Sequence, residues 1–476
     1  MKSYHFFSLR SVHCMAFAAT TLLLSACING YDEDWTFSSG VTGITLESPK
    51  AEEITFTQNP EGTRVTIEWP VVLGAGGYEF IAYNVDDANA PVQLGEAQTI
   101  DGCSVDYDIA EDTSYKFCIR SLGNAEAGNK EAETATEIAY STLLATYAEI
   151  PDNTDLTTYF ETNPIPTSNE ELAYDLVAGG HYTMSGEIDF GGHKITLRGN
   201  KISHPTVTFG EKASIATFAG LKIKFIDFDC KANTSGTFLG LSKTPHDSIK
   251  VASGEFVIKD PIAIQSCNIY DVNKYLIYDN NKEKYAVENL NVNDCYIRIN
   301  QSDVLLLFKK SSTINFTLKE STLYSTKQSG KYFAQISGQR PSKITGYTNA
   351  SFNINNCTLY NIAYNKDFVN WNNYRGQSIV TLNIQKSIIV DCGNIGNKDF
   401  TNKIMGNTNM VHNFRSNTYW WNGAVGADKN DTSTLQTEPF SYTGDGTFTV
   451  TGAEQLANRT GDPRWLPETS EGDTTE

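Results

Sequence analysis

The sequence predicts an all-β protein in two parts, a β-sandwich followed by a parallel β-helix. Between residues 41 and 146, apolar and polar residues alternate in short runs separated by turn-forming residues, which is typical of a sandwich. In the second half, one short motif returns five times at intervals of 26 to 36 residues, as in a solenoid of stacked coils. The 476 residues exceed what one compact core holds, so two or more domains are expected.

The first 26 residues have the features of a bacterial lipoprotein signal peptide. Lys2 and Arg10 precede an apolar run from about Met15 to Ala26, which is too short to cross a bilayer. Small residues end this run directly before Cys27, as a signal-peptidase site requires. We therefore expect removal of residues 1–26 and lipidation of Cys27, whose acyl chains would hold the protein on the outer membrane.

The residues after Cys27 resemble a localisation signal. Residues 28–34, with Asp32, Glu33 and Asp34, resemble the acidic export tag that sends lipoproteins of Bacteroidetes to the outer face of the outer membrane. The resemblance implies a lipid-anchored protein at the cell surface. The alternative is that residues 27–40 form only an acidic, solvated tether.

The chain is acidic, with a formal net charge of −19. Loss of residues 1–26 makes it more acidic, because this segment contains Lys2 and Arg10 and no carboxylate. Such a charge disfavours nucleic acid as a partner, and it disfavours long-range attraction of polyanionic substrates. No later apolar run reaches the length of a transmembrane helix.

The first domain is expected over residues 41–146. Val65, Ile67 and Trp69 fall on one face of a strand, Tyr78 opens the next, and Tyr115 begins a later one. This order resembles a fibronectin type III domain, with Trp69 on the second strand and Tyr115 near the tyrosine-corner position. The resemblance implies a fibronectin type III-like β-sandwich that serves as a spacer.

A linker is predicted over residues 147–166, which are rich in Asp, Asn, Thr and Pro. Ser168 and Glu171 then form a capping-box pattern, which predicts a short amphipathic helix over residues 172–177. This helix would cap the open end of a β-helix spanning residues 167–466. Residues 467–476 are expected to be a disordered acidic tail.

The repeated motif reads apolar, polar, apolar, two polar residues, a small Cys or Ser, a variable residue, and an apolar one. Its copies begin at Ile262, Leu290, Phe316, Phe352 and Leu382. Apolar residues at i and i+2 share one face of a strand, and the polar pair marks a bend. The small residues would then stack inside the coils: Cys267, Cys295, Ser321, Cys357 and Ser387. We expect the three thiols to be buried, reduced and present for packing.

Earlier coils can be placed at residues 223–230 and 180–200. The predicted helix, followed by Gly180-His181-Tyr182, resembles the N-terminal cap of pectate-lyase-like right-handed parallel β-helices. The whole layout, including the ending Gly461-Asp462-Pro463-Arg464-Trp465, resembles uncharacterised surface lipoproteins of Bacteroidetes glycan-utilisation loci. That resemblance implies a right-handed β-helix and a role in a glycan-uptake complex of the outer membrane.

Catalytic residues are not identified by the sequence. A polysaccharide lyase needs a cation to neutralise a carboxylate and a base to remove the adjacent proton. Asp227 and Asp229 share a strand face and would be the place for calcium, but they fit a solvated edge better. Asp271 and Asp391 lie several coils apart and cannot form the carboxylate pair of a glycosidase. We therefore expect no cofactor or metal.

The basic patches at Lys309-Lys310 and at residues 327–343, with Arg340, fit solvated loops better than a site. No pair of cysteines has metal-binding spacing, so no zinc site is signalled.

Aromatic residues in polar surroundings are the candidate ligand site. Trp371, Tyr374 and Arg375 lie in an Asn-rich segment, and Trp420 and Trp421 lie in another. Sugar rings stack on flat aromatic faces while amides and Arg bind hydroxyl groups, so these five residues are predicted to bind a glycan. For Trp420 and Trp421, capping the end of the solenoid is an equal alternative.

The favoured interpretation is a cell-surface lipoprotein that binds a polysaccharide through its β-helix. A polysaccharide lyase of the same fold, acting by β-elimination, is the alternative. A structural or adhesion module is the third interpretation, because fold alone does not dictate function.

Overall fold

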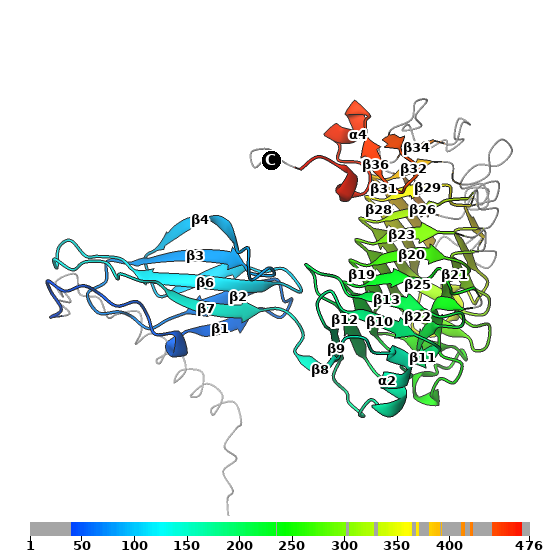
Figure 1. Cartoon of the computed structure of the whole chain (residues 1–476), viewed down its shortest axis with the longest axis horizontal. Coiled ribbons are helices and arrows are strands. Elements are labelled where there is room, and N and C mark those ends of the chain that lie inside the picture. The colour runs from blue at the N-terminus through cyan, green and yellow to red at the C-terminus, as the bar shows by residue number, and fades with distance from the viewer. Residues whose placement is uncertain are drawn as a thin grey trace, which may run out of the picture. The chain divides into compact units, whose positions relative to one another are not determined.

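The computed structural model describes residues 40–234, 236–300, 304–327, 332–363, 368–370, 380–390, 392, 411–414, 419–421 and 440–468 (Figure 1). The chain is all-β, as predicted, and divides into two compact units, Met1–Leu143 and Leu144–Glu476. In the described part of the chain, no helix is long and apolar enough to span a membrane.

The first unit contains two antiparallel sheets. One has the order β1-β2-β5 and the other β4-β3-β6-β7. The elements are η1 (Ala51–Glu53), β1 (Thr55–Gln58), β2 (Arg64–Glu68), β3 (Tyr78–Asn84), β4 (Val92–Ile100), β5 (Ser104–Asp108), β6 (Ser114–Ser121) and β7 (Thr136–Ser141). Val65, Ile67 and Trp69 pack with Phe80 and Phe117 in one core, because alternate residues of facing strands point inward.

The described part of the second unit is built mainly from three long parallel sheets, and the chain passes repeatedly from one of these sheets to the next (Figure 1). The nine-stranded sheet contains β10 (His181–Met184), β13 (Thr206–Phe209), β16 (Asp227–Asp229), β20 (Asn268–Val272), β23 (Tyr296–Ile299), β26 (Thr322–Ser325), β29 (Thr358–Tyr360), β32 (Ile388–Val390) and β34 (Tyr419–Trp421). The seven-stranded sheet contains β11 (Glu187–Asp189), β14 (Ser214–Thr217), β17 (Thr237–Leu241), β21 (Tyr275–Tyr278), β24 (Leu306–Phe308), β27 (Ala334–Ile336) and β30 (Val369–Asn370).

The eleven-stranded sheet completes each coil. It contains β8 (Thr146–Ile150), β9 (Leu172–Leu176), β12 (Ile195–Arg198), β15 (Leu221–Lys224), β18 (Phe256–Ile258), β19 (Ile262–Gln265), β22 (Tyr285–Asn293), β25 (Ser312–Lys319), β28 (Ala350–Asn355), β31 (Val380–Gln385) and β33 (Val411–Phe414). Long parallel sheets connected in this way fit the predicted parallel β-helix.

The interior is formed by like residues stacked coil on coil. One such row of the eleven-stranded sheet has the register Ile223, Ile264, Val292, Leu318, Ile354 and Ile384. Each of these side chains is at most 1% exposed. Because every coil presents its apolar residues at the same place, neighbouring coils close over one continuous core.

The predicted ladder of small residues is present. Its members are Cys267, Cys295, Ser321, Cys357 and Ser387, each 0% exposed, and the three thiols are free. The residue before each member has a positive φ, between 45° and 52°, which turns the chain between two strands. Each ladder hydroxyl or thiol donates to the carbonyl oxygen two residues before it, at 2.6 to 3.2 Å. In the preceding coil Ile226 holds the equivalent place, next to the left-handed Phe225.

The helix predicted over residues 172–177 is wrong, because this segment is strand β9. Leu172, Tyr174 and Leu176 alternate along a strand that pairs with β8 and β12. Ser168 Oγ accepts from the N–H of Glu170 at 2.9 Å, which makes a local turn in place of a helix cap.

A helix does cover the first coil, but it comes from the segment predicted as a linker. Helix α2 (Leu156–Thr162) is capped by Asp155, whose side chain accepts from Thr158 N–H. Its Phe160 ring meets the rings of Tyr174 and Phe190, each at a centroid distance of 5.1 Å. Residues 147–166 therefore contain most of β8 and all of α2, both in the second unit.

The chain returns to the nine-stranded sheet at its C-terminal end. We call residues 440–468 the strap. They contain β35 (Phe440–Tyr442), β36 (Phe448–Val450), α4 (Ala453–Ala457) and η5 (Pro463–Trp465), drawn in red beside the last coils in Figure 1. Phe448 and Val450 are buried against Tyr324, Ile388 and Val390 of the sheet, so the strap covers apolar side chains on its outer face.

Cys295→Leu should lower the free energy of unfolding by about 1–3 kcal/mol, because the larger side chain overpacks a ladder with no free space. Cys295→Ser should cost less, since Ser321 holds the next place of the same row. Denaturant unfolding of both variants tests this. Equal losses, or a disulfide mapped between ladder thiols, would contradict the packing role.

Candidate functional site

The strap is fastened to the sheet through Asp462, which is 1% exposed. Thr322 Oγ1 donates to Asp462 Oδ2 at 2.7 Å, and the Asp462 N–H donates to Thr358 Oγ1 at 3.1 Å. Trp465 Nε1 donates to the same Thr322 hydroxyl at 2.6 Å. The segment Gly461-Asp462-Pro463-Arg464-Trp465 is thus a structural fastening between the strap and strands β26 and β29.

Burial raises the pKa of Asp462 to about 6, against the lowering effect of Arg464 and Thr322. An acid whose pKa is raised on docking stabilises the docked state fully below its unfolded value of 3.8 and loses this contribution as the pH rises through about 6.

We therefore expect strap docking to weaken as the pH rises from about 4 to about 6. Hydrogen exchange of residues 461–466, corrected for its intrinsic pH dependence, should become faster over this range. Asp462→Asn should show a smaller change. If exchange in the natural chain instead becomes faster as the pH falls, Arg464 lowers the pKa of Asp462 by more than burial and Asp294 raise it, which would contradict this prediction.

A cleft of about 290 Å³ opens beside the strap on the same face, and we call it the strap cleft. Its lining comes from turns before β13, β16, β20 and β23 and from η5. The lining residues are Lys201, His204, Phe225, Ser266, Asn268, Asp294 and Arg464.

One wall of the strap cleft is a histidine–carboxylate pair. His204 Nδ1 lies 2.8 Å from Asp227 Oδ1, and Asn268 Nδ2 donates to the same oxygen at 2.7 Å. A carboxylate only accepts, so Nδ1 carries the proton and Nε2 of a neutral ring is left as an acceptor. The ring is therefore oriented to accept a hydrogen bond or a proton from a ligand.

Asp294, another lining residue of the strap cleft, accepts hydrogen bonds from two side chains. Ser266 Oγ donates to Asp294 Oδ2 at 2.8 Å, and Arg464 Nη2 donates to Oδ1 at 2.9 Å. Arg464 also lies 3.4 Å from Asp462, and its guanidinium carbon is 5.9 Å from the centre of the Tyr296 ring. Its buried Nη1 makes no hydrogen bond within the described part of the chain.

Aromatic side chains continue this surface along the sheet. The register aligns Tyr270, Arg298, Tyr324 and Tyr360 in one outward column. Arg298 binds Asp271 through two hydrogen bonds of 2.9 and 2.8 Å and lies 5.1 Å from the centre of the Tyr270 ring. Tyr270 is half-buried next to the cleft residue Asn268, so an aromatic ring adjoins the polar groups.

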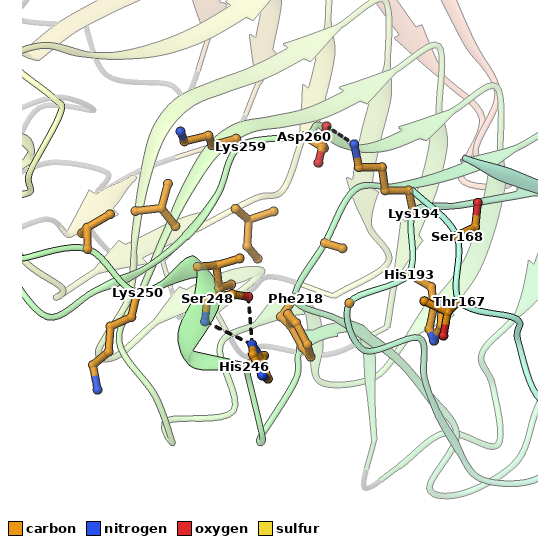
Figure 2. A pocket seen from close by; sticks show the side chains of 16 residues that line it. Thr167, Ser168, His193, Lys194, Phe218, His246, Ser248, Lys250, Lys259 and Asp260 are labelled. Atoms are coloured by element: carbon orange, nitrogen blue, oxygen red, sulfur yellow. Dashed lines mark hydrogen bonds and ion pairs between the residues drawn. The ribbon is translucent and has the colours of Figure 1, made fainter. Parts of the chain in front are cut away.

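A second, larger cleft of about 670 Å³ lies between the turns that lead into β12, β15 and β19. We call it the basic cleft. Its charged and imidazole side chains are Lys194, Lys250, Lys259, His193, His246 and the single carboxylate Asp260. Figure 2 shows the Lys194–Asp260 ion pair, at 3.2 Å, on one side and His246 with Phe218 on another. His246 belongs to the turn before η2 (Asp247–Ile249).

The predicted ligand residues are only partly placed. Cys27, Trp371, Tyr374 and Arg375 lie outside the described residues. Strand β34 pairs Trp420 with Ile389 and Trp421 with Val390, so by register Trp421 alone of the two follows Tyr360 and Val390.

The predicted acidic candidates have other partners. Asp227 holds His204, Asp229 accepts from the N–H of Lys231 at 3.0 Å, and Asp271 holds Arg298, while Asp391 lies outside the described residues. In the described segments, no three His, Cys, Asp or Glu side chains form a group able to hold a metal ion.

The described residues of the two basic patches have local surroundings. Lys309 lies 6.0 Å from the centre of the Tyr278 ring, and Lys310 Nζ donates to the carbonyl oxygen of Lys282 at 3.0 Å. Arg340 precedes the short helix η3 (Pro341–Lys343).

The sequence did not single out His204, Ser266, Asn268, Asp294 or Arg464 as one site. They come from three coils and a segment some 170 residues further on, so their meeting depends on the stacking register and on the strap. The only local signal is that Ser266 and Asp294 are each the second residue of the polar pair that precedes the small residue of a repeat.

Three family models match the chain, and each is described as a domain of unknown function. They are DUF4992 over residues 1–179, DUF4957 over residues 180–326 and DUF5123 over residues 352–465. No curated protein matches the chain. The third match includes the Gly461 to Trp465 fastening, so it covers the strap as well as the last coils.

Proposed function

We propose that the protein is a lipid-anchored cell-surface protein that binds a polysaccharide through its parallel-sheet unit. In this proposal that unit is a right-handed parallel β-helix, and the first unit is a fibronectin type III-like spacer. Cys27 would carry the anchor, and the glycan would be delivered to an uptake complex of the outer membrane.

The strap cleft is the observation that carries the proposal. A sugar offers hydroxyl groups that donate and accept, and the cleft presents both kinds of partner: Asn268, Arg464 and Lys201 donate, while Asp294 and His204 Nε2 accept. Tyr270 and Tyr296 adjoin these groups and contact each other, with ring centres 5.9 Å apart, so aromatic surface lies beside the polar groups. Fixed polar groups beside aromatic rings are what a carbohydrate site needs.

The fibronectin type III-like fold proposed for the first unit is supported by strand order and by one hydrogen bond. Seven strands in sheets of three and four match the arrangement of such sandwiches. The Tyr115 hydroxyl accepts from the N–H of Ala110 at 2.7 Å, as a tyrosine corner does.

A glycan array probed with the full chain in detergent tests polysaccharide binding. For a glycan that binds, Tyr270→Ala should weaken binding by about 1–3 kcal/mol, the usual range for an aromatic hot spot. Tyr278→Ala is the matched control, since Tyr278 is also half-buried beneath a cation but lies on the seven-stranded sheet.

The same array tests Trp371, Tyr374 and Arg375. Loss of binding in Trp371→Ala with unchanged thermal stability would support the aromatic platform. Absence of binding to every glycan by the natural chain would contradict the proposed function.

The anchor has its own test. Cys27→Ala should move the protein from the membrane fraction to the soluble fraction, because the acyl chains would have no attachment point. A variant that still sediments with outer membranes would contradict lipidation at Cys27.

Lyase activity is a second candidate function, favoured by the His204–Asp227 pair. Asp227 would hold the ring while Nε2 removes the proton next to a uronate carboxyl group, which Arg464 or Lys201 would bind. The carbon–oxygen bond at the neighbouring carbon then breaks, and the leaving oxygen is protonated.

An ultraviolet assay for unsaturated uronate decides between the two functions. His204→Gln keeps a donor for Asp227 but has no basic nitrogen, so it should abolish product formation while leaving binding nearly unchanged. No absorbance change with uronate polymers that bind the natural chain would leave binding as the function.

A further inference from the structure

We propose that the basic cleft is a separate binding site for an organic oxyanion, a carboxylate or a sulfate ester carried on a sugar-sized ring. It shares no lining residue with the strap cleft, so it stands independently of the proposed function.

The charge of the basic cleft is opposite to that of the whole chain. Three lysines and two histidines line it with one carboxylate, whereas the chain has a net charge of −19. Repulsion from the rest of the chain would act against an anion at long range, but it is screened beyond about 8 Å at physiological salt. Contacts within the cleft therefore decide whether an anion binds.

Several donors of the cleft are available. The side chains of Lys259 and His193 have no hydrogen bond or ion pair with any other described residue. His246 Nδ1 accepts from the N–H of Ser248 at 3.1 Å, so its Nε2 carries a proton and can donate (Figure 2). These three groups can offer hydrogen bonds without breaking an existing contact.

Lys194 is a fourth donor whose present partner is easily replaced. Its ion pair with Asp260 is 3.2 Å long, and the two side chains are 41% and 47% exposed. Exposed ion pairs contribute about 0–1 kcal/mol, so exchanging Asp260 for a ligand oxyanion costs little. Asp260 can turn to solvent when the ligand binds.

Phe218 indicates that the anion is attached to a ring. The side chain is half-buried, packed on the core and part of the cleft lining. It lies so close to Gly192 that a Cβ there would be 2.9 Å from the ring, so glycine keeps the ring in this place. The buried Val257 and Ile258 also line the cleft, which gives an apolar surface beside the cations.

The size of the cleft fits such a ligand. Its 670 Å³ falls in the range of about 300–1,000 Å³ of small-molecule sites. A neighbouring cleft of about 270 Å³ shares Lys194 and Asp260 with it and contains Lys222, which is paired with Glu171 at 2.9 Å. A ligand longer than one ring can therefore continue past Lys194.

Calorimetric titration of the full chain in detergent with four probes tests the proposal: glucose, glucose 6-sulfate, glucuronate and inorganic sulfate. We expect at least one of the two charged sugars to bind about tenfold more tightly than glucose and than inorganic sulfate, a difference of about 1.4 kcal/mol. Which charged sugar binds identifies the ester or the carboxylate as the source of the anion. Added salt should weaken this binding.

Lys259→Gln should weaken binding of the charged sugar at least about fivefold. Lys212→Gln, a change at an exposed lysine outside the cleft, should leave it unchanged. Phe218→Leu should weaken binding of the charged sugar but not that of inorganic sulfate, because only the sugar has a ring to stack.

Three results would overturn the proposal. These are equal affinity for glucose and both charged sugars, equal affinity for inorganic sulfate and the charged sugars, or equal effects of the changes at Lys259 and Lys212.

Discussion

The left-handed turn before each ladder residue is the constraint on which the second unit depends. Ser266, Asp294, Glu320, Asn356 and Lys386 all adopt it, and the small residue that follows is fully buried. A positive φ is unfavourable for an L-residue, so this turn has a cost in backbone conformational energy in each of these coils. The hydrogen bond from each ladder side chain to the carbonyl two residues back accompanies the turn, and stacking of identical turns keeps the coils in register.

The constant register brings residues that are far apart in the sequence together on one surface of the second unit. Because every coil repeats its geometry, outward residues form columns, and the side chains of Asp227, Asn268 and Tyr296 follow one another on the nine-stranded sheet. The later coils carry Thr322, Thr358 and Ile388 in this column, with Tyr324 and Val390 in the next outward one, and the strap covers them. The earlier coils carry polar residues and remain open. The strap cleft lies at the boundary, where Arg464 reaches Asp294.

The two clefts differ in the chemistry they present. In the strap cleft most polar groups are already paired with one another, which fixes their directions and suits a ligand with many hydroxyl groups. In the basic cleft, the side chains of Lys259 and His193 have no partner among the described residues, which suits a ligand that brings its own charge. Preorganised pairs favour selectivity for shape, whereas free cations favour affinity for an anion.

The sequence by itself determined the all-β class, the inward face of Val65, Ile67 and Trp69, and the ladder from Cys267 to Ser387. Each follows from a short-range period, which is fixed by strand geometry whatever the rest of the chain does. Local signals failed at residues 168–177, where an apparent capping box precedes a strand, because pairing with β8 and β12 outweighs a six-residue helical preference. Only the tertiary structure determined which residues line the two clefts. His204 and Arg464 line one cleft though 260 residues separate them, and Lys194 meets Asp260 across two coils. Such meetings depend on coil stacking and on the return of the strap, and no local period carries that information.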